Sequence, residues 1–222
     1  MVKVDLHVHT HWSDDSLTTC AEVLCWAGRR DIDLVAITDH NRLGGALALK
    51  EMAPERVIVG EEIRTTQGEI IGLFLHEEIL GGLATRETTR CIHQQGGLVY
   101  VPHPVDRVRR STLMPPALLE IIDEIDLIEV FNARVPLALC NRQAEELARF
   151  YGLPQGAGSD AHQGHEIGRA YVEMPAFDDA QSFLANLIHG QIHGRLSSPL
   201  VHVGSTYAKF AKGLMTFTSS AR

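Results

Sequence analysis

Histidines and carboxylates stand together in short clusters along this chain of 222 residues, which contains 12 histidines. The first cluster is Asp5-Leu6-His7-Val8-His9, and Asp14 follows a few residues later. In an extended segment alternate side chains point the same way, so His7 and His9 can hold one metal ion between them. Such a pair is weak evidence by itself, because a chain rich in histidine shows one by chance.

Further clusters repeat the pattern along the chain. They are Thr38-Asp39-His40-Asn41, Gly60-Glu61-Glu62, Pro102-His103-Pro104 and Gly158-Ser159-Asp160-Ala161-His162. Each follows a predicted strand and none lies inside a predicted helix. Buried acids at strand ends are costly without partners, and metal ions are partners that make them tolerable. The sequence therefore predicts a metal centre built from several strand ends.

The elements that must position these clusters alternate between short β-type runs and amphipathic helical stretches, which is typical of parallel βα units. We expect strands at 2–8, 34–38, 56–59, 69–75, 98–101, 127–131, 155–158 and 169–173, and helices at 17–29, 43–52, 85–95, 116–124, 137–151 and 178–189. In a barrel of parallel strands the strand ends share one face, where active sites of such folds lie. No repeat or linker divides the chain, which predicts one α/β domain over 1–222. A terminal helix at 205–215 lies in a predicted docking segment, 196–222.

Composition narrows the possible functions. The chain has 20 basic and 28 acidic residues, a formal charge of −8, which disfavours stable binding to long nucleic acid. We expect no membrane association, because no stretch approaches the roughly 20 apolar residues that span a bilayer. The absence of a leader sequence predicts a cytoplasmic protein. The cysteines form no CxxC pair and are predicted to be small buried hydrophobes, typical of a reducing compartment; they are Cys20, Cys25, Cys91 and Cys140.

Taken together, the clusters resemble the polymerase and histidinol phosphatase (PHP) family of metallo-phosphoesterases. The similarity rests on DLHVHTHWSDDS at 5–16, TDHN at 38–41, GEE at 60–62, HP at 103–104 and GSDAH at 158–162, and it covers nearly the whole chain. The resemblance implies a distorted TIM-like (β/α)7 barrel. It also implies two or three divalent metal ions, which would be manganese, iron or zinc.

Ligand roles follow from the resemblance residue by residue. His7, His9, Glu62 and Asp160 resemble ligands of a first metal, with the two acids able to bridge between sites. The family pattern leaves one residue between the glycine and the ligand acid, which selects Glu62 and not Glu61. The ligands expected to complete the remaining sites are Asp14, His40, His103 and His162. Asp160 and His162 are also expected to take part in catalysis.

One position departs from the family pattern. Family members commonly carry a histidine on the strand after the glutamate, whereas Glu69 occupies that place here. A carboxylate is a harder ligand than imidazole, so Glu69 favours manganese or iron over zinc. His76 is the alternative ligand. The remaining histidines are expected in the core or at the surface; they are His11, His93, His165, His189, His193 and His202.

Several polar residues beside the clusters are candidates for supporting roles. Asp39 is predicted either to assist catalysis by orienting an imidazole or to cap the helix that starts near Arg42. Arg134 has a planar fork suited to a phosphate, although a surface salt bridge is the alternative. Asn132 beside it is also a candidate for substrate binding. Among Arg107, Arg109 and Arg110, one is expected to face substrate, and Arg107 is our choice.

The reaction that fits this constellation is phosphoester hydrolysis by a metal-activated hydroxide, with a small phosphorylated metabolite or nucleotide as substrate. No GxSxG or GxxxxGK motif is present to indicate a serine nucleophile or a phosphate-binding loop. The alternatives are an exonuclease-like phosphodiesterase acting on short oligonucleotides, an amidohydrolase and a non-catalytic metal-binding module. An amidohydrolase would normally need a bridging lysine on a middle strand, and only the Glu69 departure favours the non-catalytic module.

Overall fold

This computed structural model describes residues 1–106 and 108–219. Within them, nine strands form one curved sheet. The strand order is β7-β6-β5-β4-β3-β2-β1-β8-β9. The strands are β1 Val2–Val8, β2 Leu34–Ile37, β3 Val57–Thr65, β4 Gly68–Leu73, β5 Leu98–Val101, β6 Leu127–Asn132, β7 Gln155–Gly158, β8 Ala170–Met174 and β9 Gln191–Gly194.

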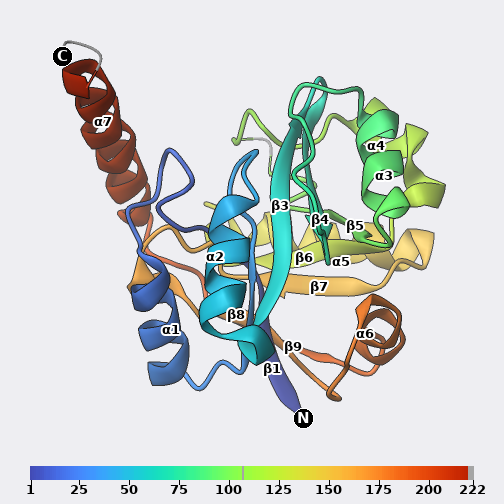
Figure 1. The fold of residues 1–222 in the computed structure, drawn as a ribbon. Coiled ribbons are helices and arrows are strands. Elements are labelled where there is room, and N and C mark those ends of the chain that lie inside the picture. Colours follow the sequence, from blue (N-terminus) through green and yellow to red (C-terminus); the bar gives the residue numbers. More distant parts are fainter. Residues whose placement is uncertain (107, 220–222) are drawn as a thin grey trace.

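Helices surround the sheet. They are α1 Cys20–Arg29, α2 Gly44–Met52, α3 Thr85–Gln94, α4 Pro115–Glu120, α5 Ala138–Tyr151, α6 Ala180–Leu187 and α7 Val201–Ser219. Short 3-10 turns occur at Pro54–Arg56, Ile122–Glu124 and Gly164–Glu166. Figure 1 shows α1 and α2 on one side of the sheet, α3 and α4 on another, and α7 extending away from the body. None of the helices in the described residues is long and apolar enough to cross a membrane.

The sheet nearly closes on itself beside β1. Just beyond the end of β7, Ala161 pairs with Val8 in a parallel bridge, and the backbone N–H of His9 donates to the Ala161 carbonyl at 2.9 Å. The end of β7 therefore lies against the end of β1, although several strands separate them in the sheet order. This mixed α/β barrel confirms the expected fold class, and it brings the ends of distant strands to one place.

Apolar side chains fill both sides of the barrel wall. Inside, Leu6 packs in one cluster with Ile71 and Tyr100, and all three are fully buried. Outside, Val23 of α1 and Leu49 of α2 belong to a second cluster that covers the strands. Burial on both sides explains why β2 is a wholly apolar run, as strands buried on both faces usually are.

The middle of the sheet departs from the expected all-parallel pattern. β3 continues to Thr65, past the predicted end at residue 59, and forms an antiparallel hairpin with β4. Glu61 and Glu62 therefore lie within a strand and not after one. β8 pairs antiparallel with β1, and β9, which was not predicted, adds an edge strand to β8. The half-exposed sequence of β9 has no clear alternation that would have marked it as a strand.

Helix ends follow local capping chemistry. The Thr19 side chain accepts from the N–H of Glu22, and the Glu22 carboxylate accepts from the N–H of Thr19, so α1 begins at Cys20 and not at the predicted residue 17. At the other end of the chain, α7 begins at Val201, earlier than the predicted 205. The role of 196–222 as a docking segment stays a prediction.

Candidate metal centre

Four buried ligand atoms converge where β1, β3 and β7 meet. His7 Nε2 lies 3.0 Å from His9 Nε2, 3.5 Å from Glu62 Oε2 and 3.6 Å from Asp160 Oδ1. His9 Nε2 lies 3.4 Å from each of the same two carboxylate oxygens. Ligands about 2.1 Å from a tetrahedral ion are separated by roughly 3.4 Å. Because neither Glu62 Oε2 nor Asp160 Oδ1 accepts a hydrogen bond from any of the described residues, this donor set fits a divalent cation.

A second group of ligand atoms shares Glu62 with the first. His40 Nδ1 lies 3.1 Å from Glu62 Oε2, and His103 Nε2 lies 3.1 Å from Glu62 Oε1. Glu69 Oε1 lies 3.8 Å from His40 Nδ1, and Glu69 is 5% exposed. His40, Glu62 and Glu69 offer ligand atoms that all lie within 4.8 Å of one another. Glu62 is therefore placed to bridge two cations.

Extension of the β2–β3 pairing holds Glu62 beside His40. His40 and Glu62 form a parallel bridge just beyond the end of β2. The N–H of Asn41 donates to the Glu62 carbonyl at 3.0 Å, and the N–H of Glu62 donates to the Asp39 carbonyl at 3.2 Å. Backbone pairing at this point fixes the relative position of the two candidate ligands before any ion binds.

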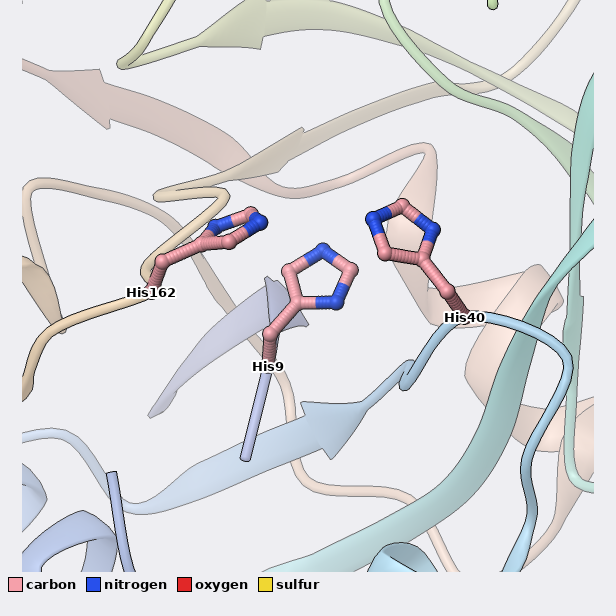
Figure 2. A group of neighbouring side chains, drawn as sticks. All are labelled: His9, His40 and His162. Carbon is pink, nitrogen blue, oxygen red and sulfur yellow. The ribbon is translucent and has the colours of Figure 1, made fainter. Parts of the chain in front are cut away.

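Three imidazoles face a common space beside the second group. Figure 2 shows the rings of His9, His40 and His162 turned toward one another, and their ligand atoms lie within 4.8 Å of one another. Asp15 joins them: Oδ1 lies 3.2 Å from His162 Nε2, and Oδ2 lies 3.5 Å from His40 Nε2. These four side chains form a third candidate site.

Asp15 takes the place that the sequence assigned to Asp14. Asp15 is 6% exposed, whereas Asp14 is exposed to solvent. The turn is fixed on both sides of these residues, because the Ser13 hydroxyl donates to Asp39 at 2.7 Å and the Ser16 hydroxyl donates to the His162 carbonyl at 2.9 Å. These contacts turn Asp15 inward, a geometry that spacing alone does not reveal.

Unusual backbone geometry marks two of the candidate ligands. Asp160 has a φ of +53° and His103 a φ of +31°, a region that side-chain-bearing residues rarely adopt. Such conformations cost about 1–3 kcal/mol each and cluster at functional sites. Beside Asp160, a Cβ on Gly158 would lie 2.3 Å from His7 Cβ and 2.9 Å from Glu129 Oε1. Only glycine allows β7 to pass this close to His7.

Glu129 of β6 orients the first imidazole, and the sequence analysis missed it. Its Oε1 lies 3.0 Å from His7 Nδ1. Its Oε2 accepts from the N–H of His103 at 2.7 Å and from Asn132 Nδ2 at 2.9 Å. A carboxylate on the second ring nitrogen commonly fixes the orientation of a metal-binding histidine. The available signal was a lone acid inside the apolar run Leu-Ile-Glu-Val-Phe.

Asp39 supports the site through another side chain. It accepts from the N–H of Thr10 at 2.6 Å and from the hydroxyl of Ser13, whose Oγ lies 3.1 Å from His9 Nδ1. The alternative interpretation, a cap for α2, is wrong, because among the described residues no side-chain hydrogen bond caps that helix. Asp39 therefore reaches His9 only through the Ser13 hydroxyl.

The electrostatics keep Asp160, Glu62 and His9 in metal-binding form. Burial opposes ionisation of Asp160, but the Arg109 guanidinium and His7 hold its pKa well below the ordinary value. Burial likewise opposes ionisation of Glu62, and nearby imidazoles, His40 foremost, lower its pKa strongly. Burial and the neighbouring His162 lower the pKa of His9 well below its usual value. Ionised carboxylates and a neutral imidazole are the forms that coordinate metals. His7 and His40 differ: despite burial, neighbouring carboxylates raise the pKa of His7 well above its usual value and that of His40 to about 9, so a cation must displace a proton from each ring.

A cavity of about 600 Å³ opens over the second and third candidate sites. Its walls carry cationic side chains from several elements: Arg64, Arg109, Arg110, Arg134 and Lys209. Arg109 donates to Asp160 Oδ2 at 2.6 Å. Metal ligands and cations thus line one open cavity.

The expected substrate-binding residues have different positions. Arg134 lines the cavity and is 4% exposed, and its Nε lies 3.6 Å from Glu166 Oε1, so its salt bridge is buried and not at the surface. Asn132 is buried, and its side chain donates to Glu129 and to Asp160 Oδ2, at 3.2 Å for the latter. Asn132 therefore holds the candidate ligand Asp160 by a hydrogen bond. Arg107 lies outside the described residues.

The histidines outside the motifs lie mostly at the surface. His76 is exposed, and its backbone N–H donates to Gln95, so Glu69 and not His76 lies beside His40. His93 pairs with Asp126 near the surface. His202 is exposed, as expected, and it also lines the cavity from α7.

Comparison with known proteins places this geometry in a family. A PHP-associated family model matches residues 139–192. The uncharacterized protein MJ0417 of Methanocaldococcus jannaschii is 38% identical over 176 residues, which cover 78% of this chain and 70% of that protein. A two-domain protein from Bacteroides vulgatus, described as containing a PHP-like metal-dependent phosphoesterase, superposes with a TM-score of 0.70 at 18% identity.

The chain belongs to the PHP family. The superposition covers 87% of this PHP chain and 65% of the Bacteroides protein, so the chain spans about two thirds of that relative. An amidohydrolase from Chromobacterium violaceum, crystallised with sulfate and without metal, shares the fold at a TM-score of 0.60 and 18% identity. That match covers 74% of this chain and 89% of the amidohydrolase.

Proposed function

We propose that this PHP protein is a metal-dependent phosphoric ester hydrolase that acts on a small phosphorylated metabolite or nucleotide. The observation that carries the proposal is the position of Glu62. Its two oxygens lie within 3.5 Å of imidazole nitrogens from His7, His9, His40 and His103. One buried acid between two imidazole groups suits a two-metal site, in which the ions lie about 3.5–4 Å apart.

Bound divalent cations supply the main chemistry, because they lower the pKa of water and polarise phosphoryl oxygens. The chain's own residues bind and orient. Glu129 fixes the His7 ring, and Asn132 and Arg109 hold Asp160 in place. The guanidinium of Arg109 also lines the cavity, where it can stabilise negative charge on a phosphoryl group.

The cation set that we propose is two or three ions, with manganese or iron favoured over zinc. Glu69 supports this preference, because it brings a hard oxygen ligand to the second group, 3.8 Å from His40 Nδ1. Asp15 brings another oxygen ligand to the third group.

The dimensions of the cavity support a small substrate. A volume of about 600 Å³ is typical of sites that enclose metabolite-sized ligands. The formal charge of −8 opposes the approach of a long polyanion, whereas the local cations suit one phosphate group. A phosphomonoester therefore suits the site better than an oligonucleotide.

The test is hydrolysis by purified protein loaded with manganese. We expect phosphate release from a panel of phosphorylated metabolites and nucleotides, and no cleavage of cyclic amides, the substrates tested for the amidohydrolase alternative. Asp160→Asn should abolish release because it removes a shared ligand charge. Asp178→Asn is the matched control and should retain activity, since Asp178 is exposed and does not line the cavity. Amide cleavage, or binding of manganese with no hydrolysis of either substrate class, would contradict the proposal.

A further inference from the structure

Helix α7 forms one wall of the cavity. His202, Ser205, Thr206 and Lys209 all line it, at a spacing of three or four residues that places them on one side of a helix. The buried guanidinium of Arg134 donates to the Ser205 hydroxyl at 2.7 Å and to the Val201 carbonyl at 3.4 Å. These contacts fix the first turns of α7 against the barrel.

The far side of the wall is fixed to the loop after β1. Lys212 Nζ donates to the carbonyls of His11 and Ser13. One turn earlier, Lys209 Nζ lies 3.2 Å from Asp15 Oδ2, the carboxylate that also contacts His162 and His40. Lys209 therefore extends from α7 toward the third candidate metal site, while Lys212 holds the backbone beside it.

Lys209 and Arg109 have matching positions in the cavity. Arg109 forms an ion pair with Asp160, and Lys209 forms one with Asp15, so each cation neutralises a carboxylate of the metal centre. The side chain of Lys209 is 62% exposed, and an ion pair this open holds its partners weakly. Its ammonium sits on a flexible four-carbon stem, so it can leave Asp15 at little cost.

We propose that Lys209 is a substrate-binding residue that contacts the phosphoryl oxygens from the α7 wall. The inference rests on the proposed function. A divalent cation held by Asp15 would neutralise that carboxylate and repel the ammonium, whereas a phosphate in the same cavity would attract it. The ion pair with Asp15 thus keeps Lys209 at the cavity until an anionic substrate replaces the carboxylate as its partner.

Kinetic constants of full-length variants test the role of Lys209. Lys209→Gln should raise KM about tenfold, the effect of losing one charge-assisted hydrogen bond, and should change kcat less than threefold. The inhibition constant of inorganic phosphate should rise by a similar factor. Lys209→Arg should restore most of the affinity. Lys212→Gln removes an ammonium from the same helix but outside the cavity lining, and should leave KM within twofold of the parent value.

Calorimetric titration of inorganic phosphate into the manganese-loaded protein separates this proposal from the proposed function. If the parent protein hydrolyses no ester but binds phosphate more tightly than Lys209→Gln does, the proposed function fails and the role of Lys209 stands. Equal phosphate binding by the two proteins would overturn the role of Lys209. An equal rise in KM for Lys212→Gln would do so too, because helix docking would explain both effects. A changed manganese content in Lys209→Gln would show that Lys209 acts on the cation site and not on the substrate.

Discussion

Two neighbouring glutamates on β3 have opposite electrostatic surroundings. Glu61 and Glu62 are both fully buried, and strand geometry directs their side chains to opposite faces. Glu62 faces four imidazoles, and its pKa is well below the ordinary value despite burial. Glu61 accepts one hydrogen bond, from the N–H of Ile79 at 2.9 Å, and burial raises its pKa from 4.5 to about 7.

The difference shows that burial alone does not define a site. Both side chains are the same residue type and both are shielded from solvent, so the surrounding groups decide which one remains charged. Glu62 has four imidazole partners from three segments of the chain. Glu61 has a second acid, Glu78, nearby, which raises its pKa further, and a distant effect of Arg42, which lowers it slightly. Chemistry is therefore expected on one face of β3 only.

We call the face of β3 that carries Glu62 the inner face and the face that carries Glu61 the outer face. The largest effect should come from removing the charge of Glu62 on the inner face. Glu62→Gln is expected to lower phosphate release about 10³-fold, because bridged cations contribute several kcal/mol to such reactions. Elemental analysis should show lost metal in the same variant. Glu61→Gln is the matched control one residue away and should keep both metal content and activity. Equal losses in the two variants would erase the contrast between the faces.

Titration of Glu61, on the outer face, should affect how the stability of the protein depends on pH. Since folding raises the pKa of Glu61 from 4.5 to about 7, the folded protein holds this proton more tightly than the unfolded chain. Its stabilising contribution is complete below pH 4.5 and is lost as pH rises through 7, a change of about 3 kcal/mol. Glu61→Gln should lack this loss and still accept from Ile79.

Urea denaturation of the metal-free proteins at pH 4.5 and pH 8.5 measures this effect. The free energy of unfolding of Glu61→Gln minus that of the parent protein should be larger at pH 8.5 than at pH 4.5. A difference that does not change with pH would mean that folding does not raise the pKa of Glu61.

The contrast also explains what the sequence could and could not predict. The clusters at His7, His40, His103 and Asp160 were predictable, because each lies in or directly after a short strand with its own local signal. The choice of Glu62 came from the family pattern, and the structure places that residue at the cluster. The strand around it was wrongly ended at residue 59, since a glycine and two acids do not look like a buried strand.

Contacts between distant segments were beyond the sequence. Glu129 is 122 residues from His7, and only the barrel closure brings the two together. Asp15 replaces Asp14 because hydrogen bonds to Asp39 and His162 fix the turn, which no spacing rule describes. The antiparallel placement of β4 depends on the hairpin with β3, whereas the alternation of strands and helices suggested parallel strands.

A third prediction concerns Glu129, the acid that contacts Nδ1 of the His7 ring. Glu129→Gln should weaken manganese binding about 10- to 100-fold, the usual cost of losing a carboxylate behind a ligand histidine. The new amide would face the N–H of His103 with a donor where an acceptor is needed. Calorimetric titration of manganese measures the loss. Asp126→Asn is the control, because it alters a carboxylate and histidine pair, with His93, away from the metal centre.

The smallest effect should be a change of metal preference at Glu69. Glu69→His replaces a hard oxygen with a softer imidazole beside His40 and should raise zinc affinity relative to manganese several-fold. Burial raises the pKa of Glu69, and the charge of Glu62 raises it further, so the substitution also removes repulsion between two acids. Glu69→Gln separates these effects, because it removes the charge and keeps an oxygen ligand. Competition titrations should show a shift in the ratio of zinc affinity to manganese affinity for Glu69→His alone. A parallel change in the affinities for both metals would mean that the charge at residue 69, and not its ligand type, sets the metal preference.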